Sequence, residues 1–184
     1  MSFSNHCDLC ENEITDLKKG LTCKLTDKYP DFKNICSKIK FDEKFQSKIE
    51  IVNLELERIR RDKKSVYVSF YFLIIIGFII IIGGNYFIKS TFKSVYTFKI
   101  SFGIISVGIT FLGVAYTKLN AYKKKFRNAK FDKTSFDEFL EKYKIRYKAN
   151  FDFKEKIYGT QEVIVGLEFM NWDKKTTTKT YKIS

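Results

Sequence analysis

Three things are scarce in this chain of 184 residues: proline and histidine each occur once, and no acidic residue lies between 66 and 117. Proline interrupts helices, so its scarcity permits long continuous ones. A hydrolytic metal site needs histidine and carboxylate ligands around an open position, and His6 is the single histidine. A nucleophilic triad needs a positioned histidine or lysine base. Neither a nucleophile elbow nor a phosphate-binding glycine loop is present. We therefore expect a protein that is not an enzyme.

Charge is unevenly distributed along the chain, whose net charge is +13. Residues 118–184 hold 17 lysine or arginine residues against nine acidic ones, whereas the charged residues of 66–117 are three lysines. Basic flanks beside an apolar segment favour the anionic surface of a membrane, with nucleic acid as the alternative partner. The first 25 residues contain four acidic residues and no apolar core, so no signal peptide is expected.

Two apolar segments, residues 66–88 and 100–117, contain no charged residue. At about 1.5 Å per residue the first reaches roughly 35 Å, and a hydrocarbon core is about 30 Å thick. The second is just long enough. Aromatic residues near the ends suit the headgroup layer: Tyr67, Tyr86, Phe87, Phe102 and Tyr116. The sequence therefore predicts a transmembrane hairpin; the alternative is a hairpin buried in the core of a soluble protein.

Basic residues cluster outside both predicted spans rather than in the loop, 89–99, that joins them. The loop contains three lysines, while the flanks hold the predicted membrane-surface set: Arg60, Arg61, Lys63, Lys64, Lys123, Lys124, Lys125 and Arg127. Flanks rich in lysine and arginine stay on the cytoplasmic side. We therefore expect a multi-pass protein of a bacterial inner membrane with both termini in the cytoplasm.

Apolar residues at helical spacing continue beyond both spans, with no proline or glycine in between. This pattern predicts that segments 41–65 and 118–130 form a cytoplasmic, antiparallel coiled-coil stalk. Its two seams are Phe45, Ile49, Val52, Leu56 and Ile59, and Ala115, Leu119, Tyr122, Phe126 and Ala129. Three acidic residues, Glu50, Glu55 and Glu57, are expected either to be solvated or to lie near Lys123, Lys124, Lys125 and Arg127.

The second span carries two faces that contain small residues. One continues the stalk seam and is expected to pack on the first span: Ser101, Ile105, Gly108, Leu112 and Ala115. The other, roughly 160° around the helix, is the small-residue stripe: Gly103, Ser106, Thr110, Gly113 and Thr117. Small residues allow close helix contact in lipid, so the stripe is a candidate surface for oligomerisation or a pore lining. Alternatively, its hydroxyls bond to their own backbone and it faces lipid.

All four cysteines lie within residues 7–36, as Cys7-x2-Cys10-x12-Cys23-x12-Cys36. A Cys-x2-Cys pair places two thiolates on one metal ion, and two further cysteines complete a tetrahedron. In a reducing cytoplasm this favours structural Zn²⁺ in a module spanning 1–40; disulfides, redox chemistry or unliganded thiols are the alternatives. Four thiolates leave no open position for catalysis. His6 is expected to be exposed, although it can replace a ligand.

The cysteine segment also carries a longer pattern. After the Cys-x2-Cys pair comes Lys19-Gly20-Leu21-Thr22-Cys23-Lys24-Leu25-Thr26, followed by Pro30-x-Phe32 and the final Cys36. This pattern resembles a short N-terminal module of small, mostly uncharacterised bacterial membrane proteins. The resemblance covers residues 7–36 and implies a shared metal-bound module without a particular activity.

Residues 131–184 are predicted to form a small, basic α+β domain. A capping box, Ser135 with Glu138, starts a helix whose apolar face is Phe136, Phe139, Leu140, Tyr143 and Tyr147. Two strands, 161–170 and 176–183, follow, and alternation at Thr178, Thr180 and Lys182 indicates one wet face. Basic and aromatic residues interleave over 142–158. That pattern fits either a small core with a basic surface or a site for single-stranded nucleic acid.

Together these patterns predict a mostly α membrane protein: a two-helix transmembrane hairpin extended into a cytoplasmic coiled-coil stalk, with a small four-cysteine zinc module and a small α+β C-terminal domain. We expect a non-enzymatic, membrane-anchored adaptor that self-associates through its hairpin and presents its modules to a cytoplasmic protein or RNA. No small-molecule substrate is expected. The alternative is an oligomeric membrane effector or pore of a bacterial antiphage system, such as a CRISPR accessory protein, an analogy of size and topology alone.

Overall fold

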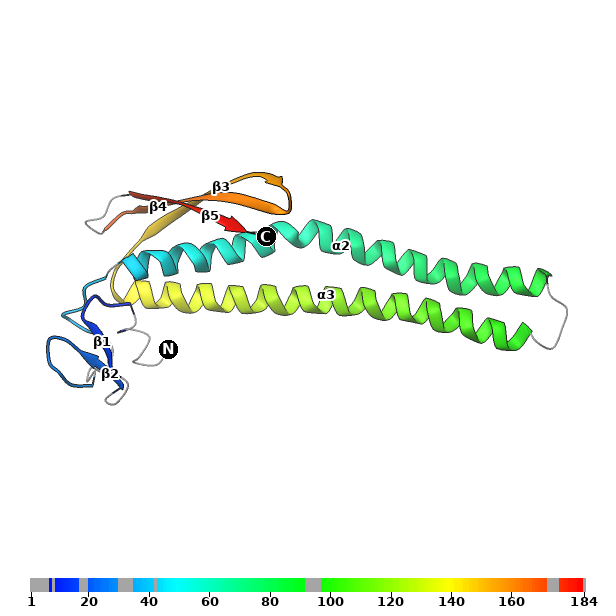
Figure 1. Cartoon of the computed structure of the whole chain (residues 1–184), viewed down its shortest axis with the longest axis horizontal. Coiled ribbons are helices and arrows are strands. Elements are labelled where there is room, and N and C mark those ends of the chain that lie inside the picture. The colour runs from blue at the N-terminus through cyan, green and yellow to red at the C-terminus, as the bar shows by residue number, and fades with distance from the viewer. Residues whose placement is uncertain are drawn as a thin grey trace. The chain divides into compact units, whose positions relative to one another are not determined.

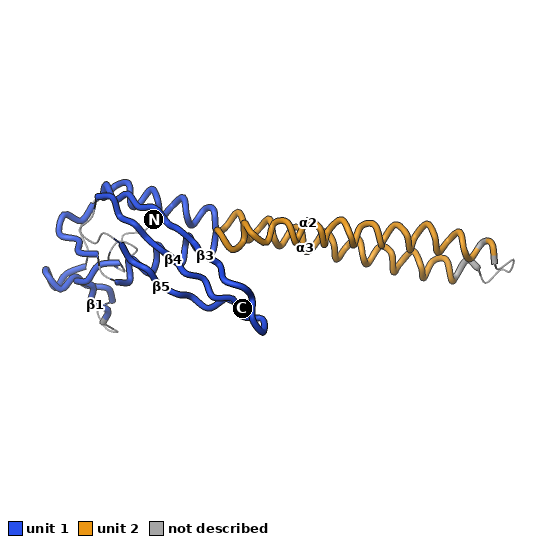
Figure 2. The backbone as a smooth tube through the Cα atoms, turned by 90° about the horizontal axis from the view of Figure 1, so that it is seen from above, with its two compact units in different colours: residues 1–56, 129–184 blue, residues 57–128 orange. Residues whose placement is uncertain are grey.

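A computed structural model describes residues 7, 9–16, 20–29, 35–41, 43–91, 97–171 and 176–183. The elements, in chain order (Figure 1), are β1 (Glu13–Asp16), β2 (Gly20–Cys23), α2 (Glu43–Thr91), α3 (Thr97–Lys142), β3 (Tyr147–Ile157), β4 (Thr160–Phe169) and β5 (Thr176–Ile183). The chain divides into two compact units (Figure 2): unit 1 comprises residues 1–56 and 129–184, and unit 2 comprises residues 57–128. The fold is α plus β, with two long apolar helices and a small antiparallel sheet.

Unit 2 is an antiparallel pair made of the C-terminal part of α2 and the N-terminal part of α3 (Figure 2). Gly77 lies against Leu112, and Gly84 lies against Ile104, so positions rise along one helix as they fall along the other. A Cβ at Gly108 would lie 2.3 Å from Cγ1 of Ile81 and 3.1 Å from the carbonyl oxygen of Gly77. Glycine is therefore required at Gly108, because any side chain there would push the two backbones apart.

The predicted packing face of the second span is confirmed: Gly108 and Ala115 are buried, while Ser101, Ile105 and Leu112 are half-buried. Along the two uncharged runs, the remaining surface of the pair is mostly apolar and is exposed or half-buried. Of the most apolar 18-residue windows in α2 and α3, 6% and 11% are buried within the chain. The core helix of a soluble protein is mostly buried, which neither of these windows is. Both helices are long and apolar enough to cross a membrane.

Unit 1 has a core where the helix ends meet the sheet. The N-terminal part of α2 contributes Phe45, Ile49 and Val52, and the C-terminal part of α3 contributes Phe136, Phe139 and Leu140, packed with Ile145, Leu167 and Phe169. A second cluster joins Leu54 of α2 to Val163 and Val165 of β4. The first seam of the predicted stalk is therefore buried, as expected. However, the N-terminal part of this seam, from Phe45 to Val52, is not part of an isolated coiled coil, because residues of the sheet pack against it.

The sheet has the order β3–β4–β5, with both pairs antiparallel. Strands β4 and β5 confirm the two predicted strands, and β3 was not predicted. Along β3, half-buried residues alternate with exposed ones, which places Tyr147, Phe151 and Phe153 on the inner face. Tyr158 and Gly159 turn β3 into β4 with φ values of 48° and 85°. Two consecutive positive φ values are typical of a type I′ hairpin turn.

The predicted capping box at Ser135 is wrong, because α3 continues through it from Thr97 to Lys142. No proline or glycine lies between residues 114 and 142 to end the helix earlier. The helix ends instead at Lys142, and Lys144 in the following turn has a φ of 56°. The amide of Ile145 donates to Leu140 O at 3.0 Å and the amide of Lys144 donates to Glu141 O at 2.9 Å, a Schellman motif. Tyr147 therefore belongs to β3 rather than to the helix.

Candidate functional site

The four cysteines of the predicted zinc set line one cavity in unit 1. The cavity has a volume of about 240 Å³, and its walls also include Asn12, Glu13, Thr22, Thr26 and Ser37. None of the four cysteines is in a disulfide; Cys10 is buried and Cys7, Cys23 and Cys36 are half-buried. Residues separated by up to 29 positions in the sequence are thus brought to one place by the fold of the module.

Short backbone contacts hold this arrangement. The amide of Cys10 donates to Cys7 O at 2.9 Å, which closes the turn of the Cys-x2-Cys pair. The amide of Lys40 donates to Cys10 Sγ at 3.5 Å, and an antiparallel bridge joins Cys10 to Phe41. Strands β1 and β2 pair in a register that sets Glu13 opposite Cys23. An amide that donates to a sulfur stabilises the thiolate form that binds metals.

Tyr143, just after α3, connects the cysteine cavity to the core of unit 1. Its hydroxyl accepts a hydrogen bond from the amide of Cys36 at 3.1 Å. Its ring lies 5.2 Å from that of Phe41 and 5.1 Å from that of Phe139. Burial raises the pKa of Tyr143, and the nearby thiols of Cys36, Cys7 and Cys10 add to the rise, so the phenol stays neutral.

The donor set of the cavity fits a thiophilic metal ion, whereas the distances between its thiols do not. Four thiols without a competing disulfide match the ligands of a closed, structural Zn²⁺ site. Within the described residues, no group of three or more His, Cys, Asp or Glu side chains is close enough to hold a metal ion. His6 lies outside the described residues. Zinc binding by the four cysteines therefore stays a prediction.

Zinc content is the direct test of this centre. We expect the purified full chain to carry about one zinc ion, measured by inductively coupled plasma mass spectrometry. Cys10→Ser and Cys36→Ser should each lower that content and speed hydrogen exchange in β1 and β2, because the metal would supply much of the folding free energy of so small a module. Thr26→Ala, which alters the same cavity without removing a thiol, is the control. Full-length protein that retains no zinc when prepared without chelator would contradict the site.

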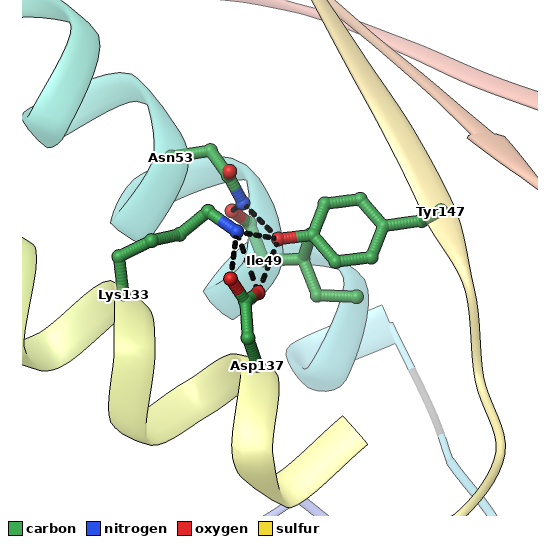
Figure 3. Close-up of polar contacts among 5 residues, drawn as sticks. All are labelled: Ile49, Asn53, Lys133, Asp137 and Tyr147. Atoms are coloured by element: carbon green, nitrogen blue, oxygen red, sulfur yellow. Dashed lines mark hydrogen bonds and ion pairs between the residues drawn. The ribbon is translucent and has the colours of Figure 1, made fainter. Parts of the chain in front are cut away.

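A second polar cluster ties β3 to both helices (Figure 3). The Tyr147 hydroxyl accepts hydrogen bonds from Asn53 Nδ2 and Lys133 Nζ, each at 2.8 Å, and donates to Asp137 Oδ1 at 3.0 Å. Asn53 Nδ2 also donates to the carbonyl of Ile49 at 2.8 Å. One donor and two acceptor positions satisfy the hydroxyl completely. The cluster therefore fixes the start of the sheet and leaves no reactive group free.

Electrostatics in this cluster favour its neutral phenol and charged amine. Burial raises the pKa of Tyr147, although the hydrogen bonds from Lys133 and Asn53 oppose the rise. Burial by itself would lower the pKa of Lys133, but hydrogen bonds to Asp137 and Tyr147 outweigh it, and the net pKa is raised. Lys133 and Asp137 are also an ion pair one helical turn apart. The ion pair and the hydrogen bonds thus link β3 to α2 and α3.

Glu50 is the most unusual charged residue, because it is fully buried. Tyr181 donates a hydrogen bond to Glu50 Oε2, and Lys179 Nζ lies 3.8 Å from the same oxygen. Glu50 Oε1 and Gln46 Nε2 are buried and make no hydrogen bond within the described part of the chain. The expectation of a solvated Glu50, or of one near Lys123, is wrong, since β5 covers this face of α2. A sequence signal was available: Gln46, Glu50 and Asn53 form a polar row beside the apolar seam.

Both of the other predicted surfaces are exposed. All eight residues of the membrane-surface set are exposed, and Arg60 pairs with Glu57 at 3.1 Å. All five residues of the small-residue stripe are exposed as well. A Cβ at Gly103 or Gly113 would meet no described atom within 4 Å. Thr110 and Thr117 donate to the carbonyls of Ser106 and Gly113 at 2.9 Å, so these hydroxyls are bonded to their own helix.

The basic and aromatic residues of 142–158 separate onto different sides of the sheet domain. The aromatic side chains of β3 face the core, and Tyr158 is fully exposed at the turn. Lys148 and Lys154 are exposed on the outer face of β3, where Lys154 lies 3.9 Å from Glu162. This arrangement is that of a small core with a basic surface. It offers a single aromatic ring for stacking, which is little for a single-stranded nucleic acid.

No protein-family model, curated protein or solved structure matches this chain.

Proposed function

We propose that the chain is a membrane-anchored assembly protein without enzymatic activity. Its hairpin lies in the bilayer of a bacterial inner membrane, and unit 1 is presented in the cytoplasm with both termini. The observation that carries the proposal is the near absence of burial, 6% and 11%, in the apolar windows of α2 and α3. In water such a surface would be prone to aggregation, whereas lipid satisfies it.

Charge supports the proposed orientation. The exposed basic residues lie on the parts of α2 and α3 that precede the first span and follow the second, and these parts belong to the same end of the hairpin. An excess of lysine and arginine next to a span favours the cytoplasmic side. Unit 1 then contacts cytoplasmic partners through the zinc module or the basic sheet domain.

Membrane insertion and orientation can be tested with one doubly tagged chain. We expect the full chain to stay with membranes after alkaline carbonate extraction. In inside-out vesicles, protease should remove both an N-terminal and a C-terminal tag, whereas spheroplasts should protect both. Release by carbonate would contradict the anchor, and digestion in spheroplasts would contradict the orientation. A cytoplasmic protein or RNA that remains with the solubilised chain would support an adaptor role, and repeated recovery of the chain alone would count against it.

Self-association through the small-residue stripe is the second part of the proposal. The hairpin uses the opposite face of α3, so the stripe remains available to another copy of the chain. Close packing of small residues drives helix association in lipid. The alternative, a pore lined by the stripe, is less favoured because Thr110 and Thr117 already have acceptors on their own helix.

Larger side chains in the stripe should weaken this association and leave the hairpin intact. We expect Ser106→Leu and Gly113→Leu each to raise the dissociation constant of the oligomer about tenfold, an overpacking effect of about 1.4 kcal/mol, measured by photobleaching counts in nanodiscs. Val107→Leu and Val114→Leu enlarge neighbouring exposed positions and serve as matched controls. Equal effects of stripe and control variants, or a monomeric wild-type chain, would contradict the assembly surface. Loss of membrane potential on expression, abolished by the stripe variants, would favour the pore.

A further inference from the structure

A shallow, open groove runs along one face of α2 in unit 2. Its volume is about 600 Å³, and its lining residues are Arg61, Lys64, Ser65, Val68, Ser69 and Phe72. These positions recur at intervals of three and four, so they lie on one side of the helix. No acidic residue lines it.

The groove changes character along its length. Arg61 and Lys64 are exposed at one end, and Val68 and Phe72 are 61% and 62% exposed at the other. At about 1.5 Å per residue, the eleven steps from Arg61 to Phe72 span roughly 16 Å. Lys64 is also the last charged residue before an uncharged run that extends to residue 88. The groove therefore begins among charges, passes two serine hydroxyls and ends on apolar side chains.

We propose that this groove binds one anionic phospholipid; the proposal rests on the membrane location proposed above. Arg61 and Lys64 bind the headgroup phosphate, since a guanidinium and an ammonium are the usual donors to phosphate oxygens. Ser65 and Ser69 donate to the ester oxygens of the glycerol backbone. Val68 and Phe72 contact the acyl chains. Basic pockets beside the cytoplasmic ends of spans are typical sites for anionic headgroups.

Other occupants fit the groove less well. A soluble phosphate compound would be held by Arg61 and Lys64 alone and would make no use of the apolar end. The spanning surface of a second copy has no acidic group with which to meet the two cations, since residues 66–117 contain none. A phospholipid matches both ends of the groove, because its charged headgroup and its apolar acyl chains follow each other as the basic and apolar lining residues do.

The test compares two pairs of neutralised residues in the full chain. Arg61→Gln with Lys64→Gln alters the groove, and Lys125→Gln with Arg127→Gln removes the same two residue types from exposed positions on α3. The T-shaped contact of Tyr67 with Tyr122 sets these positions at a similar level of the hairpin. The protein is reconstituted in phosphatidylcholine vesicles with a minority of phosphatidylglycerol. Retained phosphatidylglycerol is then counted by native mass spectrometry.

We expect the groove variant to bind phosphatidylglycerol about 30-fold more weakly, at about 1 kcal/mol for each basic residue. The control, whose two residues belong to the membrane-surface set but not to the groove, should lose much less. Equal losses in both variants would show diffuse attraction to the membrane and overturn the site. Inorganic phosphate that competes as well as the lipid would overturn a lipid site in favour of an anion site. Flotation with vesicles separates the two proposals: a chain that floats but lacks selective lipid retention disproves the groove alone. A chain that does not float disproves both.

Discussion

Replacing Phe139 by alanine is expected to lower the free energy of unfolding of unit 1 by about 3–5 kcal/mol, because a large buried aromatic side chain is lost and a cavity remains. The Phe139 side chain is 2% exposed. Its ring lies 5.8 Å from that of Phe136 and 6.2 Å from that of Phe41, at the junction of both helices with the cysteine module. Such a loss is a large part of the stability of an ordinary domain.

Hydrogen exchange of the most protected β4 amides in the full chain, purified in detergent, measures this effect. A loss of about 3 kcal/mol corresponds to more than a hundredfold faster exchange. Phe131→Ala on the same helix, at a position that is 69% exposed, is the matched control and should change little. Phe139→Leu keeps most of the volume and should fall in between, which keeps the test informative if the alanine variant does not fold. Equal exchange in all three variants would contradict the assigned core.

Tyr181→Phe is expected to destabilise unit 1 by about 3 kcal/mol, because it removes the one hydrogen bond that the described residues donate to a fully buried carboxylate. Glu50 then keeps only Lys179, whose nitrogen is 3.8 Å away and whose side chain is 41% exposed. Burial and the nearby carboxylate raise the pKa of Tyr181, so its phenol donates throughout the physiological range. The stability that this raised pKa contributes is complete below pH 10, the ordinary value for tyrosine, and is lost as the pH rises further.

A double-mutant cycle identifies the buried charge as the cause. Glu50→Leu combined with Tyr181→Phe removes both partners, and apolar replacement of both is close to neutral. We therefore expect the double variant to recover to within about 1 kcal/mol of wild type in β4 and β5 hydrogen exchange. Tyr158→Phe, at a fully exposed tyrosine, is the control. If the double variant were as unstable as Tyr181→Phe, lost packing rather than an unpaired carboxylate would be responsible.

The features that sequence alone determined about this protein are those set by local patterns. Uncharged runs of sufficient length predict the two long apolar helices, and scarce proline and glycine predict their continuity beyond the runs. Small residues every seven positions locate the packing face, at which Gly108 meets Gly77. Strands β4 and β5 followed from alternation and β-branched residues. All of these signals repeat along one helix face or one strand, so no distant residue is needed to recognise them.

Tertiary structure decided what depends on contacts between distant residues. The sequence around Glu50 suggests a solvated charge on a helix surface. Its burial follows from the packing of β5, whose Tyr181, 131 positions away, donates a hydrogen bond to it. Tyr147 continues the spacing of the α3 core residues, yet the Schellman turn at Lys144 ends the helix and sends it into β3. The cavity shared by the four cysteines likewise depends on folding of segments far apart in the chain. Whether a polar side chain is buried depends on the element that packs over it, and the residues next to it in the sequence do not identify that element.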